Sequence, residues 1–206
     1  MTPASDAEIA ARIGDEREIV LIAGDDVPTE TGIARRPATT GWDVYDPRMR
    51  AIEETPPGPA HLAARRLQDA GRLRCVITYG DDVFFEQAGV REVIALRGSV
   101  ELSLCTRCGY SEPLACLLEL LPVPRCAACG GEMRPDVRAP DERPPAERVA
   151  AASSAVGAAG LLLTVGSVPG GEIADLAVPP RTQLIDVGSG RRLAAIAELL
   201  ERRGGN

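Results

Sequence analysis

Four cysteines form two Cys-x-x-Cys pairs, Cys105 with Cys108 and Cys126 with Cys129, and 17 residues lie between the pairs. Two residues between the thiols let each pair clasp one side of a tetrahedral metal ion, and the spacing is typical of a zinc ribbon. Four thiolates leave no open position for water, so the pattern predicts a structural rather than a catalytic zinc. The alternatives are two metal-free dithiols or a pair of disulfides.

Two further cysteines lie outside these pairs. Cys75 lies within an apolar run, and Cys116 lies between the two pairs. We expect both to be small core residues. The alternatives are a nucleophile for Cys75, which would need a source of thiolate activation, and a redox or fifth-ligand role for Cys116.

Acidic residues gather in two Gly-Asp-Asp triplets, each of which closes an apolar run at residues 24–26 and 80–82. If these runs are neighbouring parallel strands, the four carboxylates meet at one edge of a sheet, where open α/β folds place their ligands. Such a cluster could hold Mg²⁺ or a cationic ligand, with Arg97 neutralising part of it. The alternative is helix capping, solvated acids and an internal Arg–Asp pair. The four residues are Asp25, Asp26, Asp81 and Asp82.

Composition narrows the class of protein. The chain has 206 residues, of which 45% are hydrophobic and 26% charged, as expected of a globular protein. Its net charge of -7 argues against nucleic-acid binding. No apolar run approaches the roughly 20 residues that cross a membrane, and the acidic start "MTPASDAEIAARI" lacks a signal pattern. We therefore expect a cytoplasmic protein that binds neither membrane nor nucleic acid.

The elements that must position these residues are short apolar runs alternating with helical patterns. The pattern predicts strands in 18–24, 74–80, 92–98, 160–168 and 182–188, and helices in 5–13, 58–71 and 191–203. The last helix places Leu193, Ile196, Ala197 and Leu200 on one face.

This alternation indicates an α/β fold, a Rossmann-like doubly wound parallel sheet with an inserted four-cysteine zinc ribbon. We place the discontinuous Rossmann-like domain at 1–100 and 149–206. The zinc-ribbon insertion then covers 101–148, of which the Pro-rich stretch 139–148 reads as a linker.

Over roughly residues 17–190, the order of these segments resembles the sirtuin family of NAD-dependent protein deacylases, some of which are ADP-ribosyl transferases. "GPAHLAARRLQDAGRLRCVIT", "EQAGVREVIALRGSV" and "GLLLTVGS" are similar to three of its motif-bearing segments, and the zinc spacing fits. The resemblance implies a cofactor site at Gly24, Asp82, Gly166, Ser167 and Asp186.

Several functional positions depart from the family pattern. Arg97 stands where the family carries its catalytic histidine, and an arginine stays protonated and cannot act as a base. His61 is the only histidine; it matches a helical position of the family, and we expect it to be a packing residue. In the "TYGDDVFF" motif Thr78 and Asp82 match the family, but Gly80 replaces the asparagine that positions ribose and water.

Other departures affect the phosphate, the ribose and the substrate. Asp25 and Asp26 stand in the phosphate loop, where carboxylates repel phosphate and can themselves occupy backbone N–H groups. Pro140 removes a donor from the strand that would pair with a substrate peptide. Asp186 replaces an asparagine near the adenine ribose, although an acid there can also bind ribose hydroxyls. Most of the family's small helical module is expected to be missing from 32–59.

Together these departures lead us to predict a zinc-stabilised, catalytically degenerate sirtuin-like protein. We expect it to act by binding a protein partner as a regulatory or accessory subunit and not to be an enzyme itself, with NAD binding in doubt. The alternative is an NAD-dependent deacylase or ADP-ribosyl transferase with an altered active site. A third possibility is a repurposed enzyme that uses the acidic sheet edge.

Overall fold

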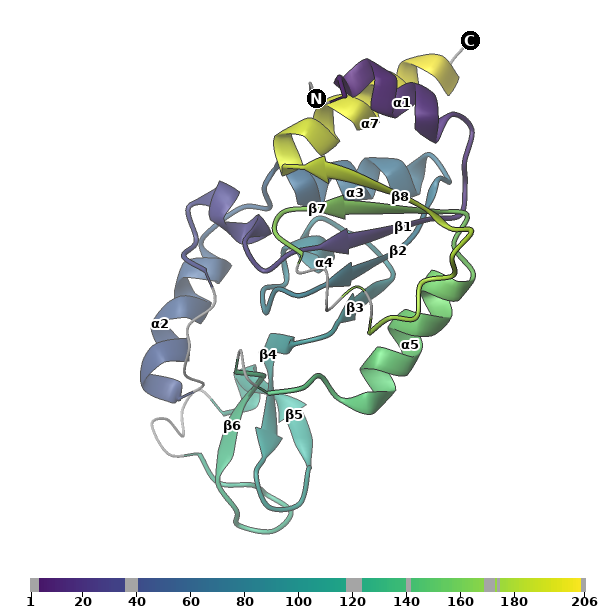
Figure 1. Cartoon of the computed structure of the whole chain (residues 1–206). Coiled ribbons are helices and arrows are strands. Elements are labelled where there is room, and N and C mark those ends of the chain that lie inside the picture. Colours follow the sequence, from purple (N-terminus) through teal and green to yellow (C-terminus); the bar gives the residue numbers. More distant parts are fainter. Residues whose placement is uncertain are drawn as a thin grey trace.

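The computed structural model describes residues 4–35, 41–117, 124–139, 142–168, 173 and 175–204, and shows two separate sheets (Figure 1). The larger sheet has five parallel strands in the order β3 (Val93–Ala95), β2 (Leu73–Thr78), β1 (Ile19–Ala23), β7 (Leu161–Val165) and β8 (Gln183–Gly188). The predicted parallel α/β sheet is therefore confirmed.

Helices cover both faces of the parallel sheet, because successive strand residues point to opposite faces. In β1, Leu21 packs in one core with α1 (Asp6–Ile13), α3 (Pro59–Asp69) and α7 (Gly190–Gly204). Its neighbours Val20 and Ile22 pack in a second core with α5 (Ala146–Gly157). A strand buried on both faces has to be apolar throughout, which explains the uninterrupted sequence IVLIA of β1.

Local signals define the two terminal helices as predicted. Ser5 and Glu8 form a capping box at the start of α1: the Glu8 N–H donates to Ser5 Oγ, and the Ser5 N–H donates to Glu8 Oε2 at 2.7 Å. The predicted apolar face of α7 is confirmed, because its residues are at most 1% exposed. They are Leu193, Ile196, Ala197 and Leu200.

The smaller sheet is antiparallel and lies in Figure 1 at the end of the molecule away from α1 and α7. Its strand order is β5 (Ser111–Pro113), β4 (Gly98–Cys105) and β6 (Met133–Val137), with the short 3-10 helix η2 (Leu114–Cys116) after β5. Two further elements, α2 (Trp42–Glu53) and α4 (Phe84–Gln87), pack against it in a third core.

Helix α2 corrects the expectation that most of a helical module is missing from 32–59. It buries Trp42, Tyr45, Met49 and Ile52, and the Trp42 Nε1–H donates to the carbonyl of Met133 at 2.8 Å. The helix therefore packs against the smaller sheet and not against the parallel one.

The linker prediction for 139–148 is wrong at its end, because α5 already begins at Ala146. Pro140 lies outside the described residues. The division of the chain at residues 100 and 149 stays a prediction. In the part of the chain that the structure describes, no helix combines the length and apolar character that crossing a membrane requires.

Candidate functional site

The strand order reverses direction at β1, and this defines a crevice. From β1 the chain proceeds to β2 and β3 on one side, and later to β7 and β8 on the other. In open α/β sheets, ligands bind at such a switch point, outside the carboxyl ends of the two central strands. The loops that follow β1 and β7 are therefore the candidate ligand loops.

These two loops approach each other at Gly24 and Gly166. A Cβ atom on Gly24 would lie 2.5 Å from the carbonyl oxygen of Ser167. Gly166 has a positive φ of 73°, and a Cβ there would collide with the carboxylate of Asp26. Gly24 needs glycine because a neighbouring backbone nearly touches it, and Gly166 needs glycine because of its positive φ and the nearby carboxylate.

A carboxylate bridges the crevice. The Ser167 N–H donates to Asp26 Oδ1 at 2.7 Å, and the Ser167 hydroxyl donates to Asp26 Oδ2 at 2.6 Å. Asp26 therefore occupies a backbone N–H group, as was expected for an acid in this loop. That N–H lies on the loop after β7, outside the loop that carries Asp26.

The five predicted cofactor residues do not all meet. Gly24, Gly166 and Ser167 come together at the crevice. Asp186 lies one strand further on, in β8, where its Oδ1 accepts from the Thr164 hydroxyl at 2.9 Å and from the Gly188 N–H at 3.0 Å. Asp82 follows β2, on the other side of β1.

Asp82 lies in a dry environment beside the one histidine. It is 3% exposed, and burial raises the pKa of its carboxyl group to about 7. Burial lowers the pKa of His61 to about 4, and Nδ1 of His61 accepts from the Gly58 N–H at 3.0 Å. The neutral ring therefore carries its proton on Nε2, which lies 3.9 Å from Asp82 Oδ1. His61 also contacts the rings of Phe84 and Phe85, in agreement with a packing role.

The acidic residues do not form a metal site, because each carboxylate has a separate partner. Asp25 pairs with Arg35, and the buried Asp81 pairs with Arg48 at 2.6 Å. Asp82 Oδ1 accepts from the Phe84 N–H at 3.1 Å. Among the described residues, the only group of three or more potential metal ligands is the cysteine cluster.

Arg97 does not neutralise these acids, contrary to one of our hypotheses. Its Nη1 donates to the carbonyls of Ala139 at 3.2 Å and Glu142 at 2.8 Å, and the residue is 7% exposed. The side chain thus fastens the segment that follows β6. Among the described residues, Arg35 and Arg48 pair with the acidic loops, and sequence reasoning missed both.

The four paired cysteines converge as predicted. Their sulfur atoms all lie within 4.8 Å of one another, with Cys105 and Cys129 at 3.6 Å and Cys108 and Cys126 at 3.7 Å. A tetrahedral zinc with Zn–S bonds near 2.3 Å requires sulfur atoms about 3.8 Å apart, so the donor set fits the ion. None of the six cysteines forms a disulfide in this structure, which gives no support to the disulfide alternative.

The backbone around the cluster favours thiolates. The Arg107 N–H donates to Cys105 Sγ and the Gly131 N–H to Cys129 Sγ, each at 3.4 Å. Backbone N–H groups, first that of Cys108, lower the pKa of Cys105 to about 6. The pKa of Cys108 is raised instead, because the Tyr110 N–H lowers it less than the neighbouring sulfur atoms and burial raise it. Thiolates are the form that binds metal.

The two remaining cysteines differ from each other. Burial raises the pKa of Cys75 to about 11, so its thiol stays protonated at neutral pH and packs as predicted. Cys116 is exposed, so its predicted place in the core is wrong. It follows Leu114, which takes the inward position in η2.

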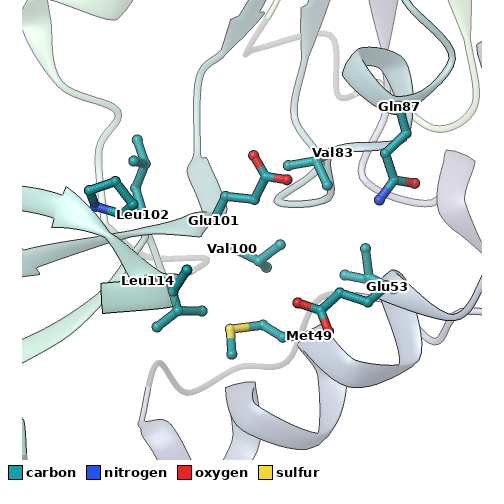
Figure 2. Close-up of a pocket in the computed structure, with 11 residues that line it drawn as sticks. Met49, Glu53, Val83, Gln87, Val100, Glu101, Leu102 and Leu114 are labelled. Carbon is teal, nitrogen blue, oxygen red and sulfur yellow. The ribbon is translucent and has the colours of Figure 1, made fainter. Parts of the chain in front are cut away.

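A separate cavity of about 340 Å³ lies between α2, α4 and the smaller sheet (Figure 2). Its apolar wall includes Met49, Val83 and Val100, and the carboxylates of Glu53 and Glu101 stand beside it. Neither Gly24 nor Ser167 lines the cavity, so it is distinct from the crevice at the switch point.

Comparisons with known proteins agree with this geometry. The sequence model of the Sir2 family matches residues 24–169. The NAD-dependent protein deacylase of Pyrococcus abyssi is 37% identical over 118 residues, which cover 55% of this chain and 47% of the relative. The NAD-dependent protein deacetylase of Cutibacterium acnes is 34% identical over 140 residues, which cover 68% and 54%. The alignments thus span about half the length of these relatives.

Solved structures share the fold over nearly the whole chain. A mutant Sir2 homologue in complex with ADP-ribose has a TM-score of 0.85 at 24% identity, with 96% of this chain and 97% of that chain covered. A Sir2 homologue in complex with NAD has a TM-score of 0.82 at 23% identity, with coverage of 98% and 97%.

These findings contradict the prediction that the chain is not an enzyme, because the relatives are named as NAD-dependent deacylases and deacetylases. The doubt about NAD finds no support either, since the matched relatives are named as NAD-dependent. The departures at Arg97 and Gly80 therefore do not by themselves show a lost activity. On the match of the family model to residues 24–169, the chain belongs to the Sir2 family.

Proposed function

We propose that the protein is an NAD-dependent enzyme with an altered active site, which removes an acyl group from a protein side chain or transfers ADP-ribose. The observation that carries this proposal is the crevice between β1 and β7. There two glycines let the loops approach, and the N–H and hydroxyl of Ser167 converge on one pair of anionic oxygens. Family membership supports the same assignment.

The residues of the crevice fit a dinucleotide phosphate. The Asp26 carboxylate accepts one bond from the Ser167 N–H and one from its hydroxyl, and it acts as a stand-in for two phosphate oxygens. Ser167 would hold the phosphate, and Gly24, whose own N–H donates to the Val165 carbonyl, would leave room for it by lacking a side chain. NAD would supply the ADP-ribosyl group that separates from nicotinamide. Asp186 lies at the carboxyl end of β8, where an acid suits a ribose hydroxyl.

Proton exchange in this site has to differ from that of a histidine-dependent enzyme. Arg97 cannot accept a proton, and His61 is buried with its Nδ1 lone pair engaged. Asp82 has a pKa of about 7, so that its carboxyl group both holds and releases a proton near neutral pH. We assign proton exchange at this sheet edge to Asp82.

Zinc is proposed as the ion of the cysteine cluster, in a structural role. The side chains that would hold it are Cys105, Cys108, Cys126 and Cys129. With all four positions of the ion filled by thiolates, it would fasten the ends of β4 and β6 and take no part in the reaction. The proposed protein partner is the acylated substrate. We also propose a cytoplasmic location, because cysteines without disulfides are typical of reducing compartments.

The test is to incubate the purified full chain with NAD and a panel of acyl-lysine peptides. We expect release of nicotinamide, which chromatography measures. Mass spectrometry should also show that the peptide loses the mass of its acyl group. Nicotinamide release without peptide would favour ADP-ribosyl transfer to protein. Gly24→Ala is the negative control, because its Cβ would force apart the loops that form the crevice. No nicotinamide release under any of these conditions would refute the proposal.

A further inference from the structure

One short segment supplies carboxylates to two anion-binding points at the carboxyl edge of the sheet. Asp26 immediately precedes the 3-10 helix η1 (Val27–Thr31), and Glu30 lies within it. Asp26 binds the loop after β7, and Glu30 binds Gly190, the first residue of α7, directly after the short loop that follows β8. The segment after β1 therefore spans both points with negative charge.

The Asp26 contact has the form of an oxyanion site. Two different donors of Ser167, a backbone N–H and a hydroxyl, each take one oxygen of the same carboxylate, at 2.7 and 2.6 Å. Such charge-assisted bonds are shorter and stronger than bonds between neutral groups. A phosphate with two oxygens on one centre could make the same pair of contacts, but not while Asp26 holds them.

The Glu30 contact strengthens the pattern. Its Oε1 accepts from the Gly190 N–H at 2.8 Å, at the first residue of α7, a helix of 15 residues. The free N–H groups and the dipole of a helix make its N-terminus attractive to anions. Glu30 Oε2 is buried without a hydrogen-bond partner among the described residues. This carboxylate oxygen is therefore desolvated next to the helix end.

We propose that Asp26 is a specificity-determining residue, an internal anion that competes with the phosphate of the ligand for Ser167, with Glu30 holding the neighbouring helix end in the same way. A ligand with a pyrophosphate link has to displace Asp26 before it binds. A nucleoside without phosphate does not. This inference rests on the proposed function, since it concerns the same crevice and the same dinucleotide.

The charge of Asp26, and not its size, carries the effect. Asp26→Asn keeps the shape of the side chain and an oxygen acceptor, but it removes the negative charge that phosphate would meet. Asp25→Asn is the matched control, because Asp25 carries the same charge one residue earlier and pairs with Arg35. If general repulsion alone weakened binding, the two variants would behave alike.

The experiment is calorimetric titration of the wild-type chain and both variants with ADP-ribose, and separately with adenosine. We expect Asp26→Asn to lower the Kd for ADP-ribose by about tenfold, the effect of replacing one charge-assisted contact. Its Kd for adenosine should stay unchanged, and Asp25→Asn should change the Kd for ADP-ribose far less. A crystal of the Asp26→Asn complex should show a phosphate oxygen on the Ser167 N–H.

Equal Kd values for ADP-ribose in the wild type and Asp26→Asn would overturn the inference, and so would the absence of ADP-ribose binding in both. An equal gain in affinity for adenosine would also overturn it. Asp26→Ser replaces Asp26→Asn if circular dichroism shows that the latter is misfolded. The two proposals fail separately. A phosphate-specific gain without nicotinamide release refutes only the proposed function, and nicotinamide release without the gain refutes only the role of Asp26.

Discussion

Arg48 and Asp81 form a bidentate ion pair in the interior of the protein. Nη2 of Arg48 lies 2.6 Å from Oδ1 of Asp81, and Nε lies 3.2 Å from Oδ2. The two side chains are 8% and 0% exposed. The pair joins α2 to the loop after β2, directly beside Asp82. It therefore links the helix that packs on the smaller sheet to the carboxyl edge of the parallel sheet.

Removal of Arg48 should destabilise the protein strongly. Arg48→Met leaves the Asp81 carboxylate buried without its cation, and we expect the free energy of unfolding to fall by about 3 kcal/mol or more. Urea denaturation at neutral pH measures the loss. Arg50→Met is the control on the same helix, because Arg50 is exposed and pairs with Asp46 four residues earlier, so the loss of stability should be small. Similar losses of unfolding free energy in both variants would show that the buried pair stabilises the protein no more than an exposed pair does.

Metal binding should depend on the four paired cysteines alone. Elemental analysis should find about one zinc per chain, and Cys105→Ser should release it and lower solubility, because the ends of β4 and β6 lose their clamp. Cys116→Ser should keep the full zinc content, because this exposed thiol is no member of the cluster. A metal-free Cys105→Ser protein that stays soluble and fully folded would contradict the structural role.

The pH dependence of stability should contain two opposing contributions from neighbouring residues. The pKa of Asp82 is raised from 3.8 to about 7, so its contribution is most favourable at low pH and is lost as the pH rises towards 7. The pKa of His61 is lowered from 6.5 to about 4, so its contribution is present above pH 6.5 and is lost as the pH falls towards 4. Between these limits the two contributions offset each other.

Single substitutions should reveal how each residue changes the free energy of unfolding with pH. Relative to the wild type, Asp82→Asn should gain stability as the pH rises from about 4 to 7, by at most about 1.4 kcal/mol per pH unit. His61→Asn should gain relative stability as the pH falls from 6.5 to about 4. Urea denaturation across this range measures both differences, and other titrating groups cancel in the comparison. Parallel curves for Asp82→Asn and the wild type would refute the raised pKa.

The parallel sheet and the cysteine cluster were predictable because their signals are local. Buried strands such as β1 read as apolar runs, and the cysteine spacing specifies its own ligand geometry. Helix α2 was missed although Trp42, Tyr45, Met49 and Ile52 recur at intervals of three and four, the period of a helix face. The reason is that this helix packs against the smaller sheet, so no pattern in the parallel sheet requires it.

The site was predictable only in part, because its decisive contacts join distant residues. Asp26 meets Ser167 across 141 positions of sequence, and Arg97 meets backbone carbonyls at Ala139 and Glu142, which no side-chain pattern reveals. The prediction of an inactive protein rested on single substitutions such as Arg97. Those substitutions show which residue cannot act as a base, but the relatives of the chain are named as enzymes.

The pairing of Gly98 with Val137 has a consequence for the part of the chain that carries the cysteine cluster. These residues begin β4 and end β6, so the chain enters and leaves the smaller sheet through adjacent positions. The contact needs glycine, because Gly98 has a φ of 98° and a Cβ there would collide with the Asp136 carbonyl. The smaller sheet is thus an insertion whose two ends are held together by strand pairing. A change in the length of the turns at its far end would therefore leave the positions where the chain enters and leaves this sheet unchanged.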